Sequence, residues 1–368
     1  MSLNSITQVW ADVGGTFTDC FVVVGGVRRS TKVLSSGKVR VKAIRCERSQ
    51  HDFQLESDTT EHPLPDHFWN GCRASWLRSD GVAVEIGKVT GFDASQNRIA
   101  VDGSENAAVE FASVSGSFVL ELDARLEAPV LATRLLLGCR LSDPFPALSV
   151  RLGTTRGTNA LLTRTGSNTT LLVTQGFADV LRIGEQDRPE LFALSVKKHT
   201  PLTEHVAEVR ERIDAQGNVL CPLDESALRE TLLQIKASGT ESLSICLMHA
   251  HIDDTHERVV ERMARELGLD QVSRSSEVAP LIKLVPRAET TTLDAYLNPI
   301  LASYVARVWE QFGGRDTCRL QMMTSGGNLV AGDTFRGRDS VLSGPAGGVV
   351  ALGYVAKSIG SSSAIGLD

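Results

Sequence analysis

Apolar and polar residues alternate over short runs in the first 34 residues of the chain. Three runs, TQVWADV (7–13), FTDCFVVV (17–24) and VRRSTKVL (27–34), contain the β-branched and aromatic residues that favour strands. Gly25 and Gly26 separate the last two runs, and glycine accepts the positive φ that a two-residue hairpin turn needs. The pattern predicts three strands, with a hairpin between the second and the third.

Residues 35–150 follow a different pattern. Short β-like runs such as VAVEI, KVTGF, NRIAVDG and SFVLEL alternate with turns of Gly, Asp, Asn and Ser, and helical periodicity is scarce before residues 128–138. PVLATRLLLG predicts a short helix, and DPFPALS predicts a linker. We expect an inserted β-rich module over this range.

From residue 151 onward, helical and strand patterns alternate. Residues 224–239 predict a helix with Asp224 as its N-cap. A second helix is predicted to begin with a capping box of Asp254 and Glu257.

Three further patterns complete this region. A long helical pattern over 289–313 contains Pro299, where we expect a kink or a break. SGPAGGVVALGYVAKSIG predicts a helix, and SAIGLD predicts a final strand. Helices alternating with strands indicate an α/β fold.

Composition narrows the class of protein. The chain has 368 residues, of which 42% are hydrophobic, enough for two or three domains. A net charge of −6 argues against binding to nucleic acid or to an anionic membrane, and no apolar run approaches the length of a membrane-spanning helix. The N-terminus has no signal-peptide pattern, and seven scattered cysteines without CxxC indicate reduced thiols, so we expect a cytoplasmic protein.

The octapeptide Asp12–Asp19 (DVGGTFTD) is the strongest candidate for chemistry. Gly14 and Gly15 allow backbone N–H groups to converge on an anion, and Thr16 and Thr18 add hydroxyl groups. An aspartate beside a phosphate is tolerated when Mg²⁺ lies between them. The loop therefore indicates nucleotide phosphate plus metal, with an ordinary hairpin turn as the alternative.

Further polar groups could hold a substrate. Thr154, Thr155, Thr158 and Asn159 lie where a strand enters a helix and could bind an anion or a carbonyl group, or act only as caps.

Two more groups are candidates. Arg188, in the polar loop GEQDRP, could hold a carboxylate or form a surface ion pair. Ser325, Gly326 and Gly327 form a second possible anion nest at a strand end. The alternating His249 and His251 point opposite ways on a strand, which argues against a metal site.

The opening loop resembles the first phosphate loop of the actin-like ATPase superfamily, and in particular the opening of the hydantoinase A/5-oxoprolinase family. Stretches similar to this family follow in order over most of 151–368: RLGTTRGTNALLTR, LLVTQGFADVLRIGEQDRPELF, SICLMHAHIDDTHERVV, VPRAETTTLDAYLNP, MTSGGNL and VLSGPAGGVVALG.

The resemblance implies an actin-like, ribonuclease H-like ATPase domain with an inserted β-rich module. It implies a division into 1–34, 35–150 and 151–368, and a chain that stops before the second ATPase domain. The helix with Pro345, Gly347 and Gly348 would be the interdomain hinge helix, whose small residues allow close backbone approach.

The family's chemistry is ATP-dependent opening of a cyclic amide such as 5-oxoproline or a hydantoin, through phosphorylation of the amide oxygen. The resemblance implies that the glycines and threonines of the loop bind ATP. It also implies that Asp12 positions water bound to Mg²⁺, with Asp19 in support. It implies a hydantoinase B-type subunit or fused domain as partner, and a homo-oligomer is possible.

Two other functions use the same loop. One is an actin-like ATPase that reactivates another enzyme as a chaperone, and the other is an acetone-carboxylase-type subunit. Because the second phosphate loop and the adenosine pocket would lie beyond residue 368, we expect this chain alone to bind ATP weakly or not at all, and not to turn it over.

Overall fold

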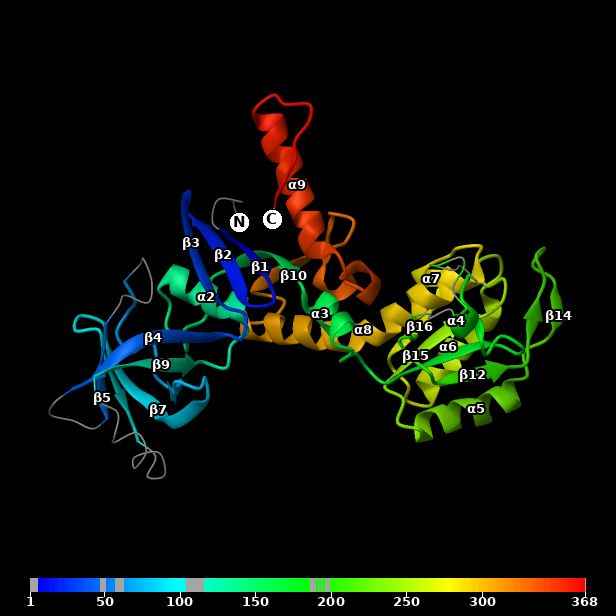
Figure 1. The fold of residues 1–368 in the computed structure, drawn as a ribbon, viewed down its shortest axis with the longest axis horizontal. Coiled ribbons are helices and arrows are strands. Elements are labelled where there is room, and N and C mark those ends of the chain that lie inside the picture. The colour runs from blue at the N-terminus through cyan, green and yellow to red at the C-terminus, as the bar shows by residue number, and fades with distance from the viewer. Residues whose placement is uncertain are drawn as a thin grey trace. The chain divides into compact units, whose positions relative to one another are not determined.

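The structure, a computed structural model, describes residues 6–46, 51–56, 63–103, 116–185, 190, 192, 194–195 and 199–367. The chain divides into two compact units (Figure 1). The first contains 1–156, 304–334 and 343–368, and the second contains 157–303 and 335–342. These units cut across the three ranges expected from the sequence.

A six-stranded sheet of order β18-β17-β10-β1-β2-β3 forms the centre of the first unit. Its strands are β1 (Thr7–Val13), β2 (Phe17–Val24), β3 (Val27–Leu34), β10 (Leu148–Thr154), β17 (Cys318–Met323) and β18 (Leu329–Ala331). The first three strands and the Gly25–Gly26 turn, with positive φ at both glycines, confirm the predicted elements. β1 pairs antiparallel with β2 and parallel with β10, so it lies at the middle of the sheet.

One face of this sheet is apolar. Val9, Ala11 and Val13 of β1 are buried, whereas Trp10 and Asp12 alternate with them and lie on the other face. Helix α2 (Ala128–Leu137), predicted from PVLATRLLLG, contacts β1, β2 and β3 and is almost entirely buried. The helix therefore belongs to this layer, although its residues fall within the range expected for the inserted module.

The β-rich module is a closed barrel of order β4-β5-β8-β7-β6-β9. Its strands are β4 (Lys38–Arg45), β5 (Asp52–Leu55), β6 (Arg73–Leu77), β7 (Ala83–Asp93), β8 (Arg98–Val101) and β9 (Ser117–Asp123). The predicted runs VAVEI and KVTGF belong to the single strand β7, which bends at an irregular register between Val89 and Gly91. Because the barrel is closed, none of these six strands is an exposed sheet edge.

A parallel sheet of order β12-β11-β15-β16 forms the centre of the second unit. Its strands are β11 (Thr169–Thr174), β12 (Val206–Val209), β15 (Ser242–Cys246) and β16 (Val272–Arg274), and a hairpin of β13 (Arg212–Ile213) and β14 (Val219–Cys221) follows β12. Its helices are α3 (Arg156–Leu162, which begins one residue before the unit), α4 (Val180–Ile183), α5 (Glu225–Ala237), α6 (Thr255–Glu266), α7 (Ser275–Val278) and the first part of α8 (Leu284–Gln311). Short 3-10 turns lie at Gly332–Thr334 and Gly337–Asp339.

Most elements predicted after residue 150 are present, with three differences. Asp224 caps α5 as predicted, but the Asp254 side chain makes no cap bond and instead accepts hydrogen bonds from Arg258 and Arg274. The capping box is therefore wrong, because these arginines take its carboxylate. Pro299 does not break α8, which continues over 28 residues.

The predicted final strand is the third difference. Residues 361–367 form no strand, and Asp368 lies outside the described residues. A strand needs a neighbour to pair with, and no strand of the described chain pairs with this segment.

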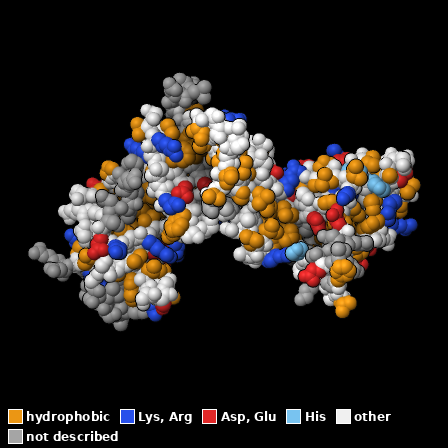
Figure 2. All heavy atoms as spheres, turned by 45° about the horizontal axis from the view of Figure 1, so that its top comes forward, with side chains coloured by type: hydrophobic (Ala, Val, Ile, Leu, Met, Phe, Trp, Pro, Cys, Tyr) orange, Lys and Arg blue, Asp and Glu red, His pale blue; other side chains and the backbone are white. Residues whose placement is uncertain are grey.

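Helix α9 (Ser343–Ser358) confirms the helix predicted from SGPAGG, and Ser343 is its buried residue. Val349, Tyr354 and Val355 are more than half exposed, as is Ile359 just beyond the helix. The space-filling view also shows hydrophobic side chains on the surface (Figure 2). In the part of the chain that the structure describes, no helix is long and apolar enough to cross a bilayer.

The barrel contains a buried acid. Glu121 on β9 is 2% exposed and accepts hydrogen bonds from Lys38 (2.7 Å) and Arg40 (2.9 Å). Burial acts to raise the pKa of Glu121, but these two cations outweigh burial, and the pKa lies below its ordinary value of 4.5. Because the pKa of Glu121 is lower in the folded chain than in the unfolded chain, its ionised carboxylate stabilises the fold at pH values above the pKa of the unfolded chain. This stabilisation is lost as the pH falls through the pKa of the folded chain.

We predict that Glu121→Gln lowers the free energy of unfolding by about 1–3 kcal/mol at pH 7, because two cations lose their charged acceptor. The difference in free energy of unfolding between the variant and the unchanged protein should become smaller below about pH 4. Urea denaturation at pH 7 and pH 3 measures both. Glu85→Gln is the control: its exposed pair with Arg73 is 3.9 Å long, and the expected effect is below about 0.5 kcal/mol. A difference that is equal at both pH values would contradict this role.

Candidate functional site

Two carboxylates meet at one corner of the six-stranded sheet. The register of β1 and β2 places Asp12 directly opposite Asp19, and the register of β1 and β10 places Asp12 beside Gly153. Both aspartates are exposed and lie on the face opposite α2. Like charges directly opposed across two strands repel each other, so this pair is suited to a cation between them.

Each carboxylate has a different neighbour. Asp19 forms an ion pair with Lys32 of β3 at 3.2 Å, and both side chains are more than half exposed. A Cβ atom at Gly153 would lie 2.8 Å from Asp12 Oδ1, so the absence of a side chain there gives the Asp12 carboxylate its room. Carboxylate oxygens are the ligands that Mg²⁺ prefers. The pair can therefore hold a hydrated divalent cation.

The turn between β1 and β2 differs in part from the predicted nest. Gly14 donates its N–H to the Phe17 carbonyl at 3.0 Å, so this amide is not directed at a ligand. Neither Gly14 nor Gly15 has positive φ, and Gly14 is required because a Cβ would lie 2.9 Å from that carbonyl. Gly15 and Thr16 are exposed at the tip of the turn.

Thr18 lies on β2, directly after the turn. It is fully buried, and its hydroxyl pairs with Ser35 Oγ at 2.9 Å. The alternation of β2 directs position 18 to the core face, whereas Asp19 lies on the open face. We therefore do not retain Thr18 as a phosphate ligand.

A cavity of about 450 Å³ lies on this open face of the sheet. Asp12, Asp19 and Gly153 line it, together with Trp10 and Phe21, whose rings stack at a centroid distance of 4.7 Å. The residues of α9 that line the cavity are small: Ser343, Gly344, Gly347, Gly348 and Ala351. The sequence indicated the acids and the glycines separately. The cavity brings them together across more than 300 residues of chain.

The predicted hinge residues lie in the first turns of α9, with Pro345 and Gly348 exposed. A Cβ at Gly347 or Gly348 would meet nothing within 4 Å, so the described chain makes no close backbone approach at either glycine. Gly327 does make a close approach: its φ is +78°, and a Cβ there would lie 2.9 Å from Val350 of α9. The Ser325–Gly327 turn, at the end of β17, therefore packs against α9.

The threonines at the end of β10 and just after it form hydrogen bonds within the fold. Thr154 is fully buried, and its hydroxyl accepts the Arg156 N–H at 3.2 Å. Thr155 donates its hydroxyl to the Val13 carbonyl at 3.2 Å. In the second unit, Thr158 donates to the Val341 carbonyl at 2.5 Å, and Asn159 is exposed on α3. Thr154, Thr155 and Thr158 therefore use their hydroxyl groups in contacts within the fold, as caps and connectors. The predicted Arg188 lies outside the described residues.

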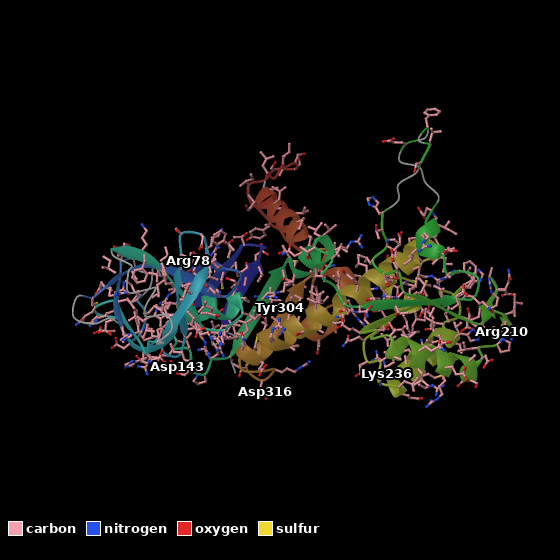
Figure 3. All side chains as sticks on the ribbon, turned by 60° about the horizontal axis from the view of Figure 1, so that its bottom comes forward. Arg78, Asp143, Arg210, Lys236, Tyr304 and Asp316 are labelled. Atoms are coloured by element: carbon pink, nitrogen blue, oxygen red, sulfur yellow. The ribbon has the colours of Figure 1, made fainter. Side chains whose placement is uncertain are left out.

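A charged network that the sequence did not indicate lies at the end of β10. Glu127 accepts from Arg156 at 2.6 Å and from Arg307 at 2.9 Å. The Arg156 guanidinium covers the ring of Tyr304, which lies on α8 (Figure 3), with 4.2 Å to the centroid. Burial raises the pKa of Tyr304 above its ordinary value, so the phenol stays protonated. The network fixes the point at which β10 enters α3.

The cysteines do not offer a nucleophile at this site. All seven are free thiols, and burial raises the pKa of Cys20, Cys72, Cys246 and Cys318 to about 12. A thiol needs to ionise before it attacks. These four therefore act as small apolar core residues, as expected from their scattered positions.

The fold is shared with two solved structures of ATP-dependent enzymes. The nucleotide-free structure of acetone carboxylase matches with a TM-score of 0.60 and 19% identity, over 97% of this chain and 41% of that chain. The ATP-dependent caprolactamase of Pseudomonas jessenii matches with a TM-score of 0.54 and 22% identity, over 96% of this chain and 41% of that chain. Both matches include almost the whole chain, and at this identity they establish similarity of fold.

Residues 135–268 match the family model of the hydantoinase/oxoprolinase N-terminal region. Residues 287–368 match a second family model, described as hydantoinase/oxoprolinase. The chain belongs to this hydantoinase/oxoprolinase family. The 5-oxoprolinase of Saccharomyces cerevisiae is 38% identical over 229 residues, covering 55% of this chain and 18% of that protein. 5-Oxoprolinase 1 of Arabidopsis thaliana is 39% identical over 253 residues, covering 61% of this chain and 20% of that protein. The chain thus spans about a fifth of the length of these relatives.

We predict that Gly153→Ala lowers the free energy of unfolding by about 1–3 kcal/mol, because the new methyl group collides with the Asp12 carboxylate. Adding Asp12→Ala should recover much of this loss, since the double variant removes the colliding atoms. Thermal unfolding of the four proteins measures the coupling. Gly91→Ala in the barrel is the control, because its nearest contact would be 3.8 Å. Additive effects of the two changes would show that the carboxylate does not lie against Gly153.

Proposed function

We propose that this chain forms the phosphate- and metal-binding part of an ATP-dependent enzyme that opens a cyclic amide. The observation that carries the proposal is the pair of opposed carboxylates, Asp12 and Asp19, beside an exposed glycine–threonine turn and a cavity. We also assign the first unit to the actin-like ATPase class, because a central mixed sheet presents this turn at the end of its first strand.

The exposed parts of the turn define roles for its residues. Gly15 and Thr16 lie at the tip, where backbone N–H groups and a hydroxyl can contact phosphate oxygens. Asp12 holds Mg²⁺ through a bound water, and Asp19 adds a second carboxylate directly opposite. Lys32, paired with Asp19, offsets part of the negative charge of this corner.

ATP, when bound, supplies the phosphoryl group that activates the amide oxygen, so that water can attack the ring carbon and phosphate can leave. An unstrained lactam has little drive to open, which is why coupling to ATP is chemically sensible. The part of the chain described here orients the phosphates and the metal.

The choice of reaction rests on the relatives. The 5-oxoprolinases of Saccharomyces cerevisiae and Arabidopsis thaliana are 38% and 39% identical to this chain. The acetophenone carboxylase gamma subunit of Aromatoleum aromaticum is 29% identical over 63% of this chain and 34% of that protein. Ring opening of a cyclic amide such as 5-oxoproline or a hydantoin is therefore favoured over carboxylation. Carboxylation is the second candidate, supported by the fold of acetone carboxylase.

The exposed apolar residues of α9 support a partner. Val349, Tyr354 and Val355 would be covered in a protein that contains more of the family's length, in the same chain or in a hydantoinase B-type subunit. We propose that such a covering element completes the ATP site beside the cavity of the first unit.

The test is phosphate release in the full protein that carries this chain, with 5-oxoproline, hydantoin or bicarbonate plus a ketone as co-substrate. We expect stimulation by a cyclic amide, and a loss of about a hundredfold or more in kcat for Asp12→Asn, because a charged metal ligand becomes neutral. Asp80→Asn, at an exposed barrel turn, is the control and should keep its activity. Stimulation by bicarbonate and ketone alone, or an active Asp12→Asn variant, would overturn the assignment.

A further inference from the structure

The parallel sheet of the second unit has a change of winding direction at its centre. From β11 the chain continues to β12 on one side of β11, whereas β15 lies on the other side and leads outward to β16. In open α/β sheets, ligands bind outside the carboxyl ends of the strands at such a point. The carboxyl ends of β11 and β15 are therefore the place to search for a second binding site.

Helix α8 begins at this edge. Val285 and Ala288 of its first turns pack with Val180, which follows β11, and with Cys246, the last residue of β15. Arg287 Nη2 donates to the carbonyl of Leu247, in the turn after β15, at 2.8 Å. The amino end of a 28-residue helix, where the helix dipole is positive, thus lies against the end of β15.

Arg287 has unmet hydrogen-bonding capacity. Its side chain is fully buried, and its Nε and Nη1 have no acceptor in the part of the chain that the structure describes. A buried cation with unpaired donors is costly unless an anion compensates it. Arg134 is also buried and its Nε likewise has no partner among the described residues, but its Nη1 donates to two carbonyls and its guanidinium covers the Phe145 ring. Arg287 has one carbonyl partner among the described residues.

The buried acids of this region are already committed. Glu257 accepts from Leu247 N at 3.0 Å, from Ser275 Oγ at 2.6 Å and from Ser276 N at 2.9 Å. Glu211 accepts from Thr174 Oγ1 and pairs with His256 Nδ1 at 2.7 Å. Neither carboxylate supplies an acceptor to the Arg287 nitrogens.

A second unpartnered group comes from the turn after β15. His251 Nδ1 is buried, and no described residue is its hydrogen-bond partner. Its pKa lies below the ordinary value because of burial first, and then because of the positive charges of Arg287 and His249. His249 is fixed separately, with Nδ1 2.7 Å from the Ile213 carbonyl. His251 thus adds a second unpartnered nitrogen, and the positive charge of Arg287 acts on its ring.

We propose that Arg287, His251 and the first turn of α8, here called the Arg287 cluster, bind a small carboxylate. The guanidinium presents planar N–H groups that match two carboxylate oxygens, and the helix terminus favours negative charge. Because Arg287 has no exposed surface, the carboxylate enters by displacing the side chains that cover it.

The identity of the natural carboxylate rests on the proposed function. 5-Oxoproline carries a carboxylate on its lactam ring, whereas 2-pyrrolidinone has the same ring without it. A site that recognises the carboxylate would separate ring acids from neutral lactams. Binding at the Arg287 cluster requires neither ATP nor turnover, so it can be measured even if the proposed reaction is wrong.

The test is calorimetric titration of the chain with 5-oxoproline, acetate, 2-pyrrolidinone and inorganic phosphate, without nucleotide. We expect saturable binding of 5-oxoproline and acetate and none of 2-pyrrolidinone. Arg287→Gln should weaken carboxylate binding by about tenfold to a hundredfold, because charge-assisted bonds are lost. His251→Gln should weaken it by a smaller factor. Circular dichroism checks that each variant is folded.

Arg287→Gln removes a buried charge, so this variant could fail to fold. In that case Arg287→Lys, which keeps the charge, and His251→Gln still test the proposal. Arg262→Gln, at an exposed pair with Glu266, is the matched control and should bind like the unchanged chain. Carboxylate binding that Arg287→Lys and His251→Gln leave unchanged would overturn the proposal. So would an absence of saturable carboxylate binding, or tighter binding of phosphate than of 5-oxoproline.

Discussion

The register of β1 is the constraint on which the candidate site depends. β1 pairs antiparallel with β2 and parallel with β10, and these two registers together place Asp12 opposite Asp19 and beside Gly153. A slip of one residue in β1 would move Asp12 to the face covered by α2 and expose Val13. Burial of Val9, Ala11 and Val13 against α2 therefore fixes the position of the acid. The stability of the core and the geometry of the site have the same origin.

Local elements were accessible from the sequence because local chemistry decides them. The three opening strands, the Gly25–Gly26 turn and the capped helix α5 all have the predicted bounds to within a residue or two. Predictions that depend on distant partners were less successful. The Asp254 carboxylate is taken by two arginines instead of its own helix, and the last residues form no strand because nothing described pairs with them.

The candidate site shows the same distinction. Asp12, Asp19, Gly347 and Gly348 were indicated by their motifs, but only the tertiary structure joins the acids and the glycines around one cavity. Thr18 was misplaced because the motif ignores the alternation of β2, and Gly14 is required by a close contact instead of a left-handed φ. The importance of Gly153 could not be predicted, since it arises from the parallel register of a strand 140 residues away.

The proposed role of the Asp12–Asp19 corner is to bind a metal–triphosphate. NMR of the ¹⁵N-labelled chain with Mn²⁺·ATP tests this role, because paramagnetic broadening detects weak binding and locates it. We expect selective broadening of the Gly15, Thr16 and Asp19 amides, which Asp12→Asn removes. Broadening centred on the barrel, or equal broadening over all exposed amides, would contradict it.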